Sequence, residues 1–242
     1  MELRIEADPR RAGSTAGQLA ADVLRRCIDE RGTARVVFAS APSQEGMLAA
    51  LRESGVDLHR IRAFHLDEYI GIDPEHPAGF GKWLADRLGP GPGLDRLDPL
   101  ADVDAEIGRY AALLDEAPID LALVGIGVNG HLAFNEPYDV PEPGVLVRDV
   151  ELTHASRQQQ VDDECFASLD EVPTRAFSLT PEAILRARTI VCTAVGERKA
   201  EAARATVKGP VTDACPASIL QTHDDVVMVL DADAAGLLER EG

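Results

Sequence analysis

The chain has 242 residues, 45% of them hydrophobic, and a formal net charge of −18 at pH 7. Because this length and content suit one sizeable core, we expect a single domain over residues 1–242. The negative charge argues against nucleic acids and anionic membranes as partners, since both bind basic surfaces. No run approaches the roughly 18 apolar residues of a membrane span, and the N-terminal stretch lacks a signal-peptide core. We therefore expect a cytoplasmic protein.

Apolar, β-rich runs alternate with helical patterns along the chain. Apolar residues at helical spacing predict helices within 19–28, 80–88 and 107–114. The runs that predict strands are 34–40, 61–67, 119–127, 174–180, 189–195 and 225–233. These runs are apolar nearly throughout, as is typical of strands buried on both faces. The alternation predicts an α/β fold with a doubly wound, mainly parallel sheet and helices on both faces, Rossmann-like in architecture.

Helix end signals and loops agree with this alternation. Gly32 is placed to end the first long helix, and Thr180 precedes a proline as an N-cap would. Residues 88–100 and 136–144 are rich in proline and glycine and predict loops. The second loop follows a glycine-rich turn, which makes it a candidate lid.

Ligands of open α/β sheets bind beyond the carboxyl ends of the strands, so the polar residues that follow each predicted strand are site candidates. Ser40, Ala41 and Ser43 lie between the first such strand and the helix after it. A helix N-terminus at this point would offer backbone N–H groups and hydroxyls to a phosphate. The alternative is that Ser43 only caps the helix.

Asp67 and Glu68 stand next to each other at the end of another predicted strand. Consecutive side chains of a strand point to opposite sides, so one carboxylate would face the ligand crevice and the other the protein body. A carboxylate at such a place can act as a general base when burial and its neighbours tune its pKa. The alternative is an ordinary solvated acidic pair.

The stretch GIGVNGHLAFNEP, residues 125–137, directly follows a predicted strand. Its glycines allow close backbone approach and expose Asn129 and His131 at the rim of the sheet. Together His131 and Glu136 form a candidate pair for proton transfer, because a carboxylate can hold one imidazole nitrogen while the other meets the substrate. The alternative is a structural histidine in a tight turn.

Lysine is rare here, with Lys82, Lys199 and Lys208 beside 21 arginines. We expect Lys199 in the first turn of a helix that follows the strand at 189–195, where the helix dipole disfavours a cation. A cation held there suits the capture of a phosphate, and a solvated surface lysine is the alternative. In contrast, Lys208 lies near the end of the same helix, where the dipole favours it, and is interpreted as structural.

The sequence gives no pattern for a metal or a redox centre. The four cysteines form no C-x-x-C pair, and no second histidine stands at zinc-ligand spacing from His131. We expect reduced thiols, no metal site and no cofactor.

Four segments together resemble the glucosamine-6-phosphate deaminase/isomerase family: FHLDEYIGIDPEHP, GIGVNGHLAFNEP, ERKAEA and GPVTDACPASILQTH. The resemblance extends from about Val36 to His223. The related 6-phosphogluconolactonases share the fold and a Gly-His turn, but a different sequence follows that turn. The tail FNEP therefore indicates the deaminase branch.

The resemblance implies a role for each matching position. Asp67 would remove the C2 proton of the opened amino sugar and return a proton at C1. His131, supported by Glu136, would open the pyranose ring, and Asn129, which stands where many members have aspartate, would orient His131 without carrying charge. Ser40, Ala41, Ser43 and Lys199 would lie near the sugar phosphate. The products would be fructose 6-phosphate and ammonia.

Two other functions stay open at this point. One is a deaminase or isomerase of another amino-sugar phosphate, such as galactosamine 6-phosphate. The other is a non-enzymatic sugar-phosphate sensor, because effector domains of some regulators resemble this fold. Asp67, His131 and Glu136 together argue against a sensor, as does the lack of a basic DNA-binding segment. A homo-oligomer is compatible with the sequence, which does not fix the oligomeric state.

Overall fold

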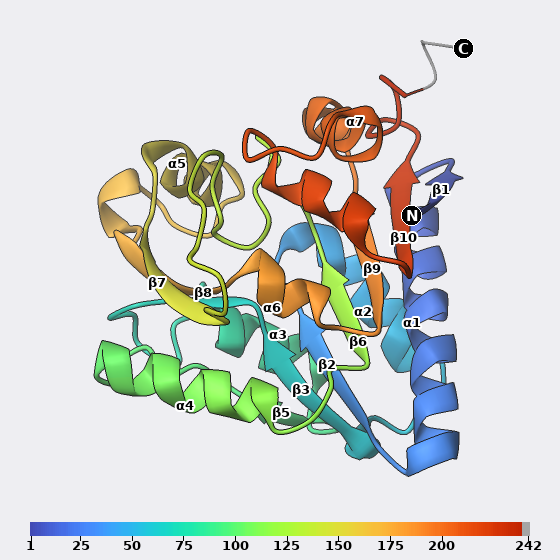
Figure 1. Cartoon of the computed structure of the whole chain (residues 1–242), viewed down its shortest axis with the longest axis horizontal. Coiled ribbons are helices and arrows are strands. Elements are labelled where there is room, and N and C mark those ends of the chain that lie inside the picture. The colour runs from blue at the N-terminus through green and yellow to red at the C-terminus, as the bar shows by residue number, and fades with distance from the viewer. Residues whose placement is uncertain (239–242) are drawn as a thin grey trace.

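A parallel sheet of seven strands forms the centre of the protein (Figure 1). The structure, a computed structural model, describes residues 1–238. In spatial order the strands are β1 (Glu2–Glu6), β10 (Val226–Asp231), β9 (Thr189–Ala194), β6 (Leu121–Val124), β2 (Ala34–Phe38), β3 (Ile61–His65) and β5 (Gly93–Asp95). Every neighbouring pair is parallel. The α/β architecture predicted from the sequence is thereby confirmed.

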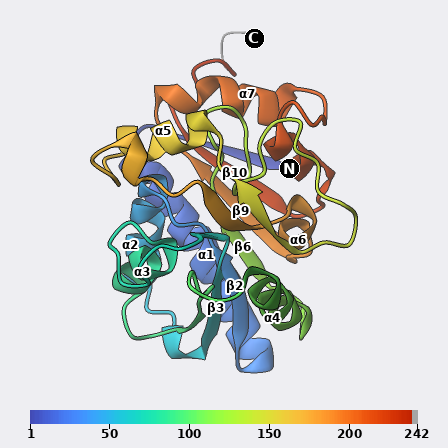
Figure 2. The same ribbon diagram turned by 90° about the vertical axis from the view of Figure 1, so that its left-hand side faces the viewer.

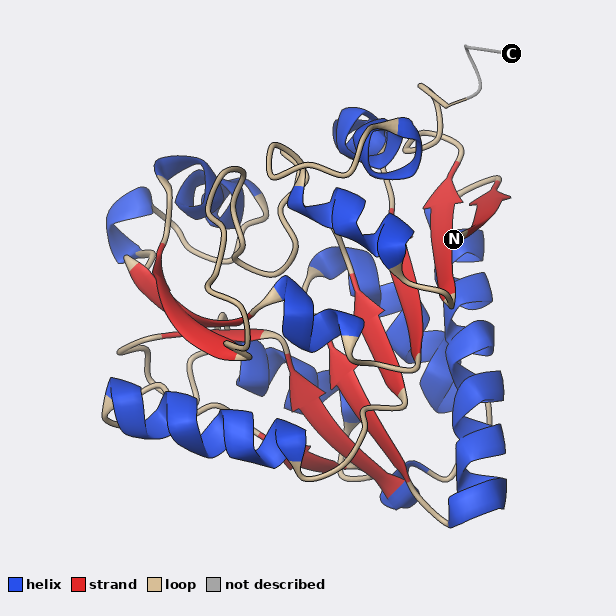
Figure 3. Ribbon diagram, viewed as in Figure 1, coloured by secondary structure: helices blue, strands red, loops and turns tan. Residues whose placement is uncertain are grey.

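A second, three-stranded sheet lies beside the first and is antiparallel, in the order β4 (Asp67–Tyr69), β8 (Arg175–Leu179) and β7 (Val147–Glu151). Figure 3 shows its strands in red, apart from the strands of the large sheet. The strand predicted at 174–180 is therefore confirmed as β8, but it lies in this second sheet and not in the large parallel one. Four of the five residues of β8 are buried, so the run is apolar like those of the central strands although its partners differ.

Helices cover both faces of the parallel sheet, as Figure 2 shows. The helices are α1 (Pro9–Arg31), α2 (Glu45–Glu53), α3 (Phe80–Leu88), α4 (Val103–Asp115), α5 (His154–Asp162), α6 (Pro181–Leu185) and α7 (Ala200–Lys208). Short 3₁₀ turns are η1 (Pro42–Gln44), η2 (Leu58–Arg60), η3 (Leu169–Glu171), η4 (Glu197–Lys199) and η5 (Pro216–Thr222). No helix among the described residues is long and apolar enough to cross a membrane.

Alternating side chains of the central strands build two separate cores, one on each face. Val36 and Phe38 of β2 pack with α1, α2 and α3, whereas Val37 between them packs with α4, α6 and α7. This is the pattern of a sheet buried on both sides. A third cluster, rich in aromatic rings, lies at the small sheet around Tyr69 and Phe80, whose rings stack 4.6 Å apart.

The end signals predicted for two helices are confirmed. Gly32 ends α1 in the left-handed conformation, with φ of 80°. The Thr180 hydroxyl caps α6 by accepting from the N–H of Ala183. The loop predicted at 88–100 contains the short strand β5, which pairs with β3.

Candidate active site

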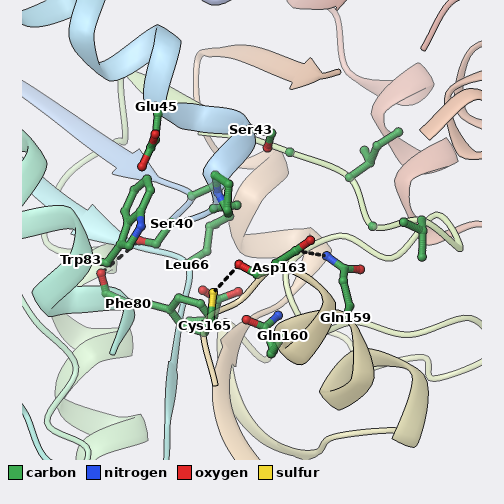
Figure 4. A pocket seen from close by; sticks show the side chains of 18 of the residues that line it. Ser40, Ser43, Glu45, Leu66, Phe80, Trp83, Gln159, Gln160, Asp163 and Cys165 are labelled. Atoms are coloured by element: carbon green, nitrogen blue, oxygen red, sulfur yellow. Dashed lines mark hydrogen bonds between the residues drawn. The ribbon is translucent and has the colours of Figure 1, made fainter. Parts of the chain in front are cut away.

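A cleft of about 930 Å³ opens at the carboxyl ends of β2, β3, β6 and β9. Figure 4 shows Ser43, from the connection into α2, and Glu45, the first residue of α2, at this cleft. It also shows Gln159, Gln160 and Asp163, from α5 and the residue after it. The predicted site residues that line it are Ser40, Ala41, Ser43, Asp67, His131 and Lys199. The other two, Asn129 and Glu136, lie behind His131 and contact each other. The structure thus brings together residues from distant parts of the chain.

Asp67 reaches the cleft because the chain changes sheet immediately after β3. Leu66 is the one residue between β3 and β4, and it bonds to both sheets: its N–H donates to Phe38 O at 3.1 Å, and its carbonyl accepts from the N–H of Leu179 at 2.8 Å. Asp67 therefore begins a new strand, although the sequence predicted it at the end of one.

His65 fixes the backbone at Asp67. Its Nε2 accepts from the N–H of Leu97 at 2.9 Å, so its Nδ1 carries the proton and donates to Asp67 O at 2.8 Å. Burial lowers the pKa of His65 to about 4, which keeps this ring neutral near pH 7. Sequence reasoning did not identify His65, because a histidine inside an apolar strand carries no local functional signal.

The two adjacent carboxylates point to opposite sides, as the strand geometry predicted. Asp67 faces the cleft, whereas Glu68 is 1% exposed and accepts from the N–H groups of Tyr69, Phe80 and Gly81. Burial, with a further contribution from the charge of Glu68, raises the pKa of Asp67 to about 8. A carboxyl whose pKa lies near neutrality is suited to take up a proton and return it.

The glycine-rich stretch has no room for side chains at two of its positions. A Cβ at Gly127 would lie 2.3 Å from ring atoms of His131, so the imidazole packs directly on this glycine. Gly130 has φ of 83°, and a Cβ there would lie 2.7 Å from Cys215 Sγ. Both glycines are therefore needed to place the His131 ring at the cleft.

Glu136 lies behind His131 in a network of donors. Its Oε2 accepts from Asn129 Nδ2 at 2.8 Å, and its Oε1 accepts from the hydroxyls of Ser156 and, at 3.4 Å, Thr153. His131 Nδ1 lies 3.6 Å from the same Oε1. Asn129 also accepts from the backbone N–H of His131 at 3.1 Å, so it holds the main chain of His131 and not its ring.

The charge state of His131 follows from its surroundings. Burial, against the opposing charge of Glu136 and with a smaller contribution from Lys199, lowers the pKa of His131 to about 4. The ring is therefore neutral near pH 7. A neutral imidazole has one N–H and one lone pair, so it can both give and accept a proton.

Lys199 lies at the boundary between η4 and α7, one residue before the helix in which the sequence predicted it. Its Nζ donates to Ile126 O in the glycine-rich stretch at 2.8 Å. Burial lowers the pKa of Lys199 to about 8. Its neighbour Arg198 also lines the cleft and forms ion pairs with Asp162 and Asp163 at 3.3 and 3.8 Å. Arg198 was missed because arginine is abundant in this sequence.

The Ser40 to Ser43 segment is a tight connection between β2 and α2. Ser40 Oγ donates to Phe80 O at 3.2 Å, and Ser43 Oγ accepts from Gln44 Nε2 at 3.2 Å. The residue that precedes α2 is Gln44, which makes no side-chain capping bond. The alternative that Ser43 caps this helix is therefore wrong.

The segment from α5 to Cys165 contributes to the wall of the cleft. Gln159, Gln160, Asp163 and Cys165 line it, whereas none of the described residues within 136–144 does. The loop predicted as a candidate lid, 136–144, therefore does not lie at the cleft. Among residues 1–238, no three His, Cys, Asp or Glu side chains are grouped so that they could hold a metal ion.

Comparisons with known proteins agree on one family. The chain is 34% identical over 238 residues to a glucosamine-6-phosphate deaminase of Listeria innocua, covering 97% of this chain and 99% of the relative. It is 38% identical over 213 residues to a glucosamine-6-phosphate deaminase of Exiguobacterium sibiricum, covering 84% and 81%. No protein-family model matches.

Solved structures give the same result. A monomeric glucosamine-6-phosphate deaminase superposes with a TM-score of 0.89 at 28% identity, covering 98% of this chain and all of that one. A 6-phosphogluconolactonase from Shewanella baltica shares the fold, with a TM-score of 0.79 at 18% identity over 96% and 97% of the two chains. On the identity and coverage of its relatives, the chain belongs to the glucosamine-6-phosphate deaminase family.

Proposed function

We propose that this protein converts glucosamine 6-phosphate and water into fructose 6-phosphate and ammonia, by an aldose–ketose isomerisation coupled to deamination. The observation that carries the proposal is Asp67, a carboxyl at the cleft whose pKa is raised by burial to about 8. Isomerisation needs one group that removes a proton from carbon and returns it to the neighbouring carbon, and such a carboxyl suits this task.

The reaction begins with the opening of the sugar ring. In our proposal His131 takes the proton of the anomeric hydroxyl and delivers one to the ring oxygen, which gives the aldehyde at C1. A neutral ring, as the lowered pKa of His131 implies, has the lone pair that the first transfer needs. Glu136 supports the imidazole, and Asn129 connects Glu136 to the backbone of His131.

Asp67 acts next. It removes the C2 proton of the open amino sugar while O1 takes up a proton from solvent, and an enolamine with a C1–C2 double bond forms. Return of the proton to C1 converts this species into the protonated imine at C2. Water adds to C2, ammonia leaves and one proton returns to solvent, which gives fructose 6-phosphate. Each proton that Asp67 removes is thus given back within one turnover.

We place the substrate phosphate at the part of the cleft lined by Arg198 and Lys199, which we call the cation side. Lys199 supplies a charged donor, and the hydroxyls of Ser40 and Ser43 and the backbone of Ala41 border the same cleft. Since the protein carries a net charge of −18, this local cation offsets a repulsive background for an anionic substrate. We also propose that residues 1–242 form one domain that carries the whole of this site.

The test is ammonia release from a panel of sugars. Purified protein is incubated with glucosamine 6-phosphate, galactosamine 6-phosphate, N-acetylglucosamine 6-phosphate and glucosamine, with the Asp67→Asn variant as control. We expect ammonia from glucosamine 6-phosphate alone, and none from the variant. Faster ammonia release from galactosamine 6-phosphate would mean that this sugar, and not glucosamine 6-phosphate, is the substrate. If the phosphorylated sugars bind but no ammonia is released, the proposal of an enzyme is refuted and a sugar-phosphate sensor is favoured.

A further inference from the structure

His131 has a buried ring nitrogen that makes no hydrogen bond to any described residue. This atom is Nδ1, and the nearest Glu136 oxygen, Oε1, lies 3.6 Å away. A buried donor or acceptor that stays unpaired destabilises a fold by about 1–3 kcal/mol. Some other contact therefore holds the carboxylate of Glu136 away from the ring.

That contact comes from α5. The Ser156 hydroxyl donates to Glu136 Oε1, and Thr153, which caps α5, reaches the same oxygen at 3.4 Å. Ser156 is 2% exposed, so water does not compete for this bond. The lone pairs that Oε1 could offer to the imidazole are thus occupied by two hydroxyls from one helix.

The other end of α5 is linked to the cation side of the cleft. Arg198 pairs with Asp162, the last residue of α5, and with Asp163. The Arg198 side chain is 59% exposed, so a ligand in the cleft can reach it. A doubly charged phosphate beside Lys199 can therefore compete with α5 for Arg198. Figure 4 shows Asp163 on the cleft side of this segment.

We propose that Ser156 is a positioning residue that decides which partner Glu136 Oε1 takes: Ser156 while the cleft is empty, and His131 Nδ1 when a bound phosphate draws Arg198 away from α5. The proposal rests on the proposed function, because it assigns the phosphate to the Arg198 and Lys199 side.

The exchange of partners matters for the tautomer of His131. Once Nδ1–H donates to Glu136, Nε2 is left with its lone pair, which is the form that can take a proton from a sugar hydroxyl. The charged groups that face the ring are Glu136 and Lys199. In this way the proton acceptor is formed only when the phosphate site is filled.

The test measures the tautomer of His131 at pH 7 by nitrogen-15 NMR, with His131→Asn to assign its signals. The Ser156→Ala variant should increase the ratio of the Nδ1–H to the Nε2–H form at least about tenfold, as expected for one hydrogen bond to a charged acceptor. Ser156→Thr keeps the hydroxyl and should match the parent. Ala155→Ser, at an exposed position of α5, is the matched control and should also match the parent.

Inorganic phosphate is the probe for the second half of the proposal. Saturating phosphate should raise the same ratio in the parent and change it little in Ser156→Ala, where Oε1 is already free of the serine. An unchanged ratio in Ser156→Ala, or an equal response to phosphate in parent and variant, would overturn the proposal. Ammonia release is measured in parallel: a parent that releases none refutes the proposed function, whereas the tautomer ratios test Ser156 independently.

Discussion

Replacing Asp67 with asparagine is expected to stabilise the fold at alkaline pH while it removes the proposed base. Burial raises the pKa of Asp67 from its ordinary value of 3.8 to about 8. Below pH 3.8 the folded and unfolded chains both hold this proton, and the carboxyl does not penalise folding. As the pH rises toward 8, the unfolded chain releases a proton that the folded chain keeps, so stability falls until both are ionised.

The size of this effect follows from the same values. Each pH unit between 3.8 and about 8 lowers the free energy of unfolding by about 1.4 kcal/mol, so the total loss of stability is at most about 6 kcal/mol. An amide does not titrate, and its own desolvation cost of about 1–3 kcal/mol is independent of pH. The stability of Asp67→Asn relative to the parent should therefore grow by about 3 kcal/mol between pH 5.5 and pH 9.

Urea unfolding at both pH values, followed by circular dichroism, measures this difference. The control is Asp213→Asn, which removes one exposed carboxylate and should stay within about 0.5 kcal/mol of the parent. Exchange of the substrate C2 hydrogen with solvent should vanish in Asp67→Asn. In the parent, kcat/KM should rise with pH as Asp67 ionises and should fall again above about 8, where Lys199 loses the charge that holds the phosphate. The reasoning is refuted if parent and Asp67→Asn lose stability in parallel as the pH rises.

Three further substitutions test the rest of the site. Lys199→Ala should weaken glucosamine 6-phosphate binding by about 1.5–3 kcal/mol but leave glucosamine unaffected; equal losses in calorimetry would contradict a phosphate role. Gly127→Ala should lower kcat roughly 10²–10⁴-fold by displacing the imidazole, whereas Gly108→Ala, on the exposed face of α4, should add about 0.5–1 kcal/mol of stability and keep activity. Asn129→Asp puts a second carboxylate beside Glu136 Oε2 and should raise the pKa of His131, which is followed by nitrogen-15 NMR; an unchanged pKa of His131 would contradict this coupling.

The strands at the centre of the fold could be predicted because they are buried on both faces. β2, β3, β6, β9 and β10 all coincide with apolar runs. The same signal misled at β8, because an apolar run shows that a strand is buried but not which strands are its neighbours. β1 was missed because this edge strand is mostly exposed and mixes charged with apolar residues.

The candidate site also has residues that the sequence predicted and contacts that it did not. Asp67, His131 and Lys199 were identifiable because each follows a recognisable strand, and parallel strands end at one edge of a sheet. The contact between Ser156 and Glu136 could not be identified from the sequence, since the two residues are 20 positions apart and the intervening chain has no periodic pattern. Such contacts depend on how α5 packs, which local sequence does not encode.

The one-residue connection between β3 and β4 has a consequence for how this chain can change over time. Side chains alternate along an extended segment, so an insertion or deletion at Leu66 would exchange the directions of Asp67 and Glu68. The cleft would then face Glu68, and Asp67 would be buried against the start of α3. The loop after Glu136, residues 137–144, does not line the cleft and can vary in length, whereas the chemistry requires the spacing from Ile61 to Asp67 to stay unchanged.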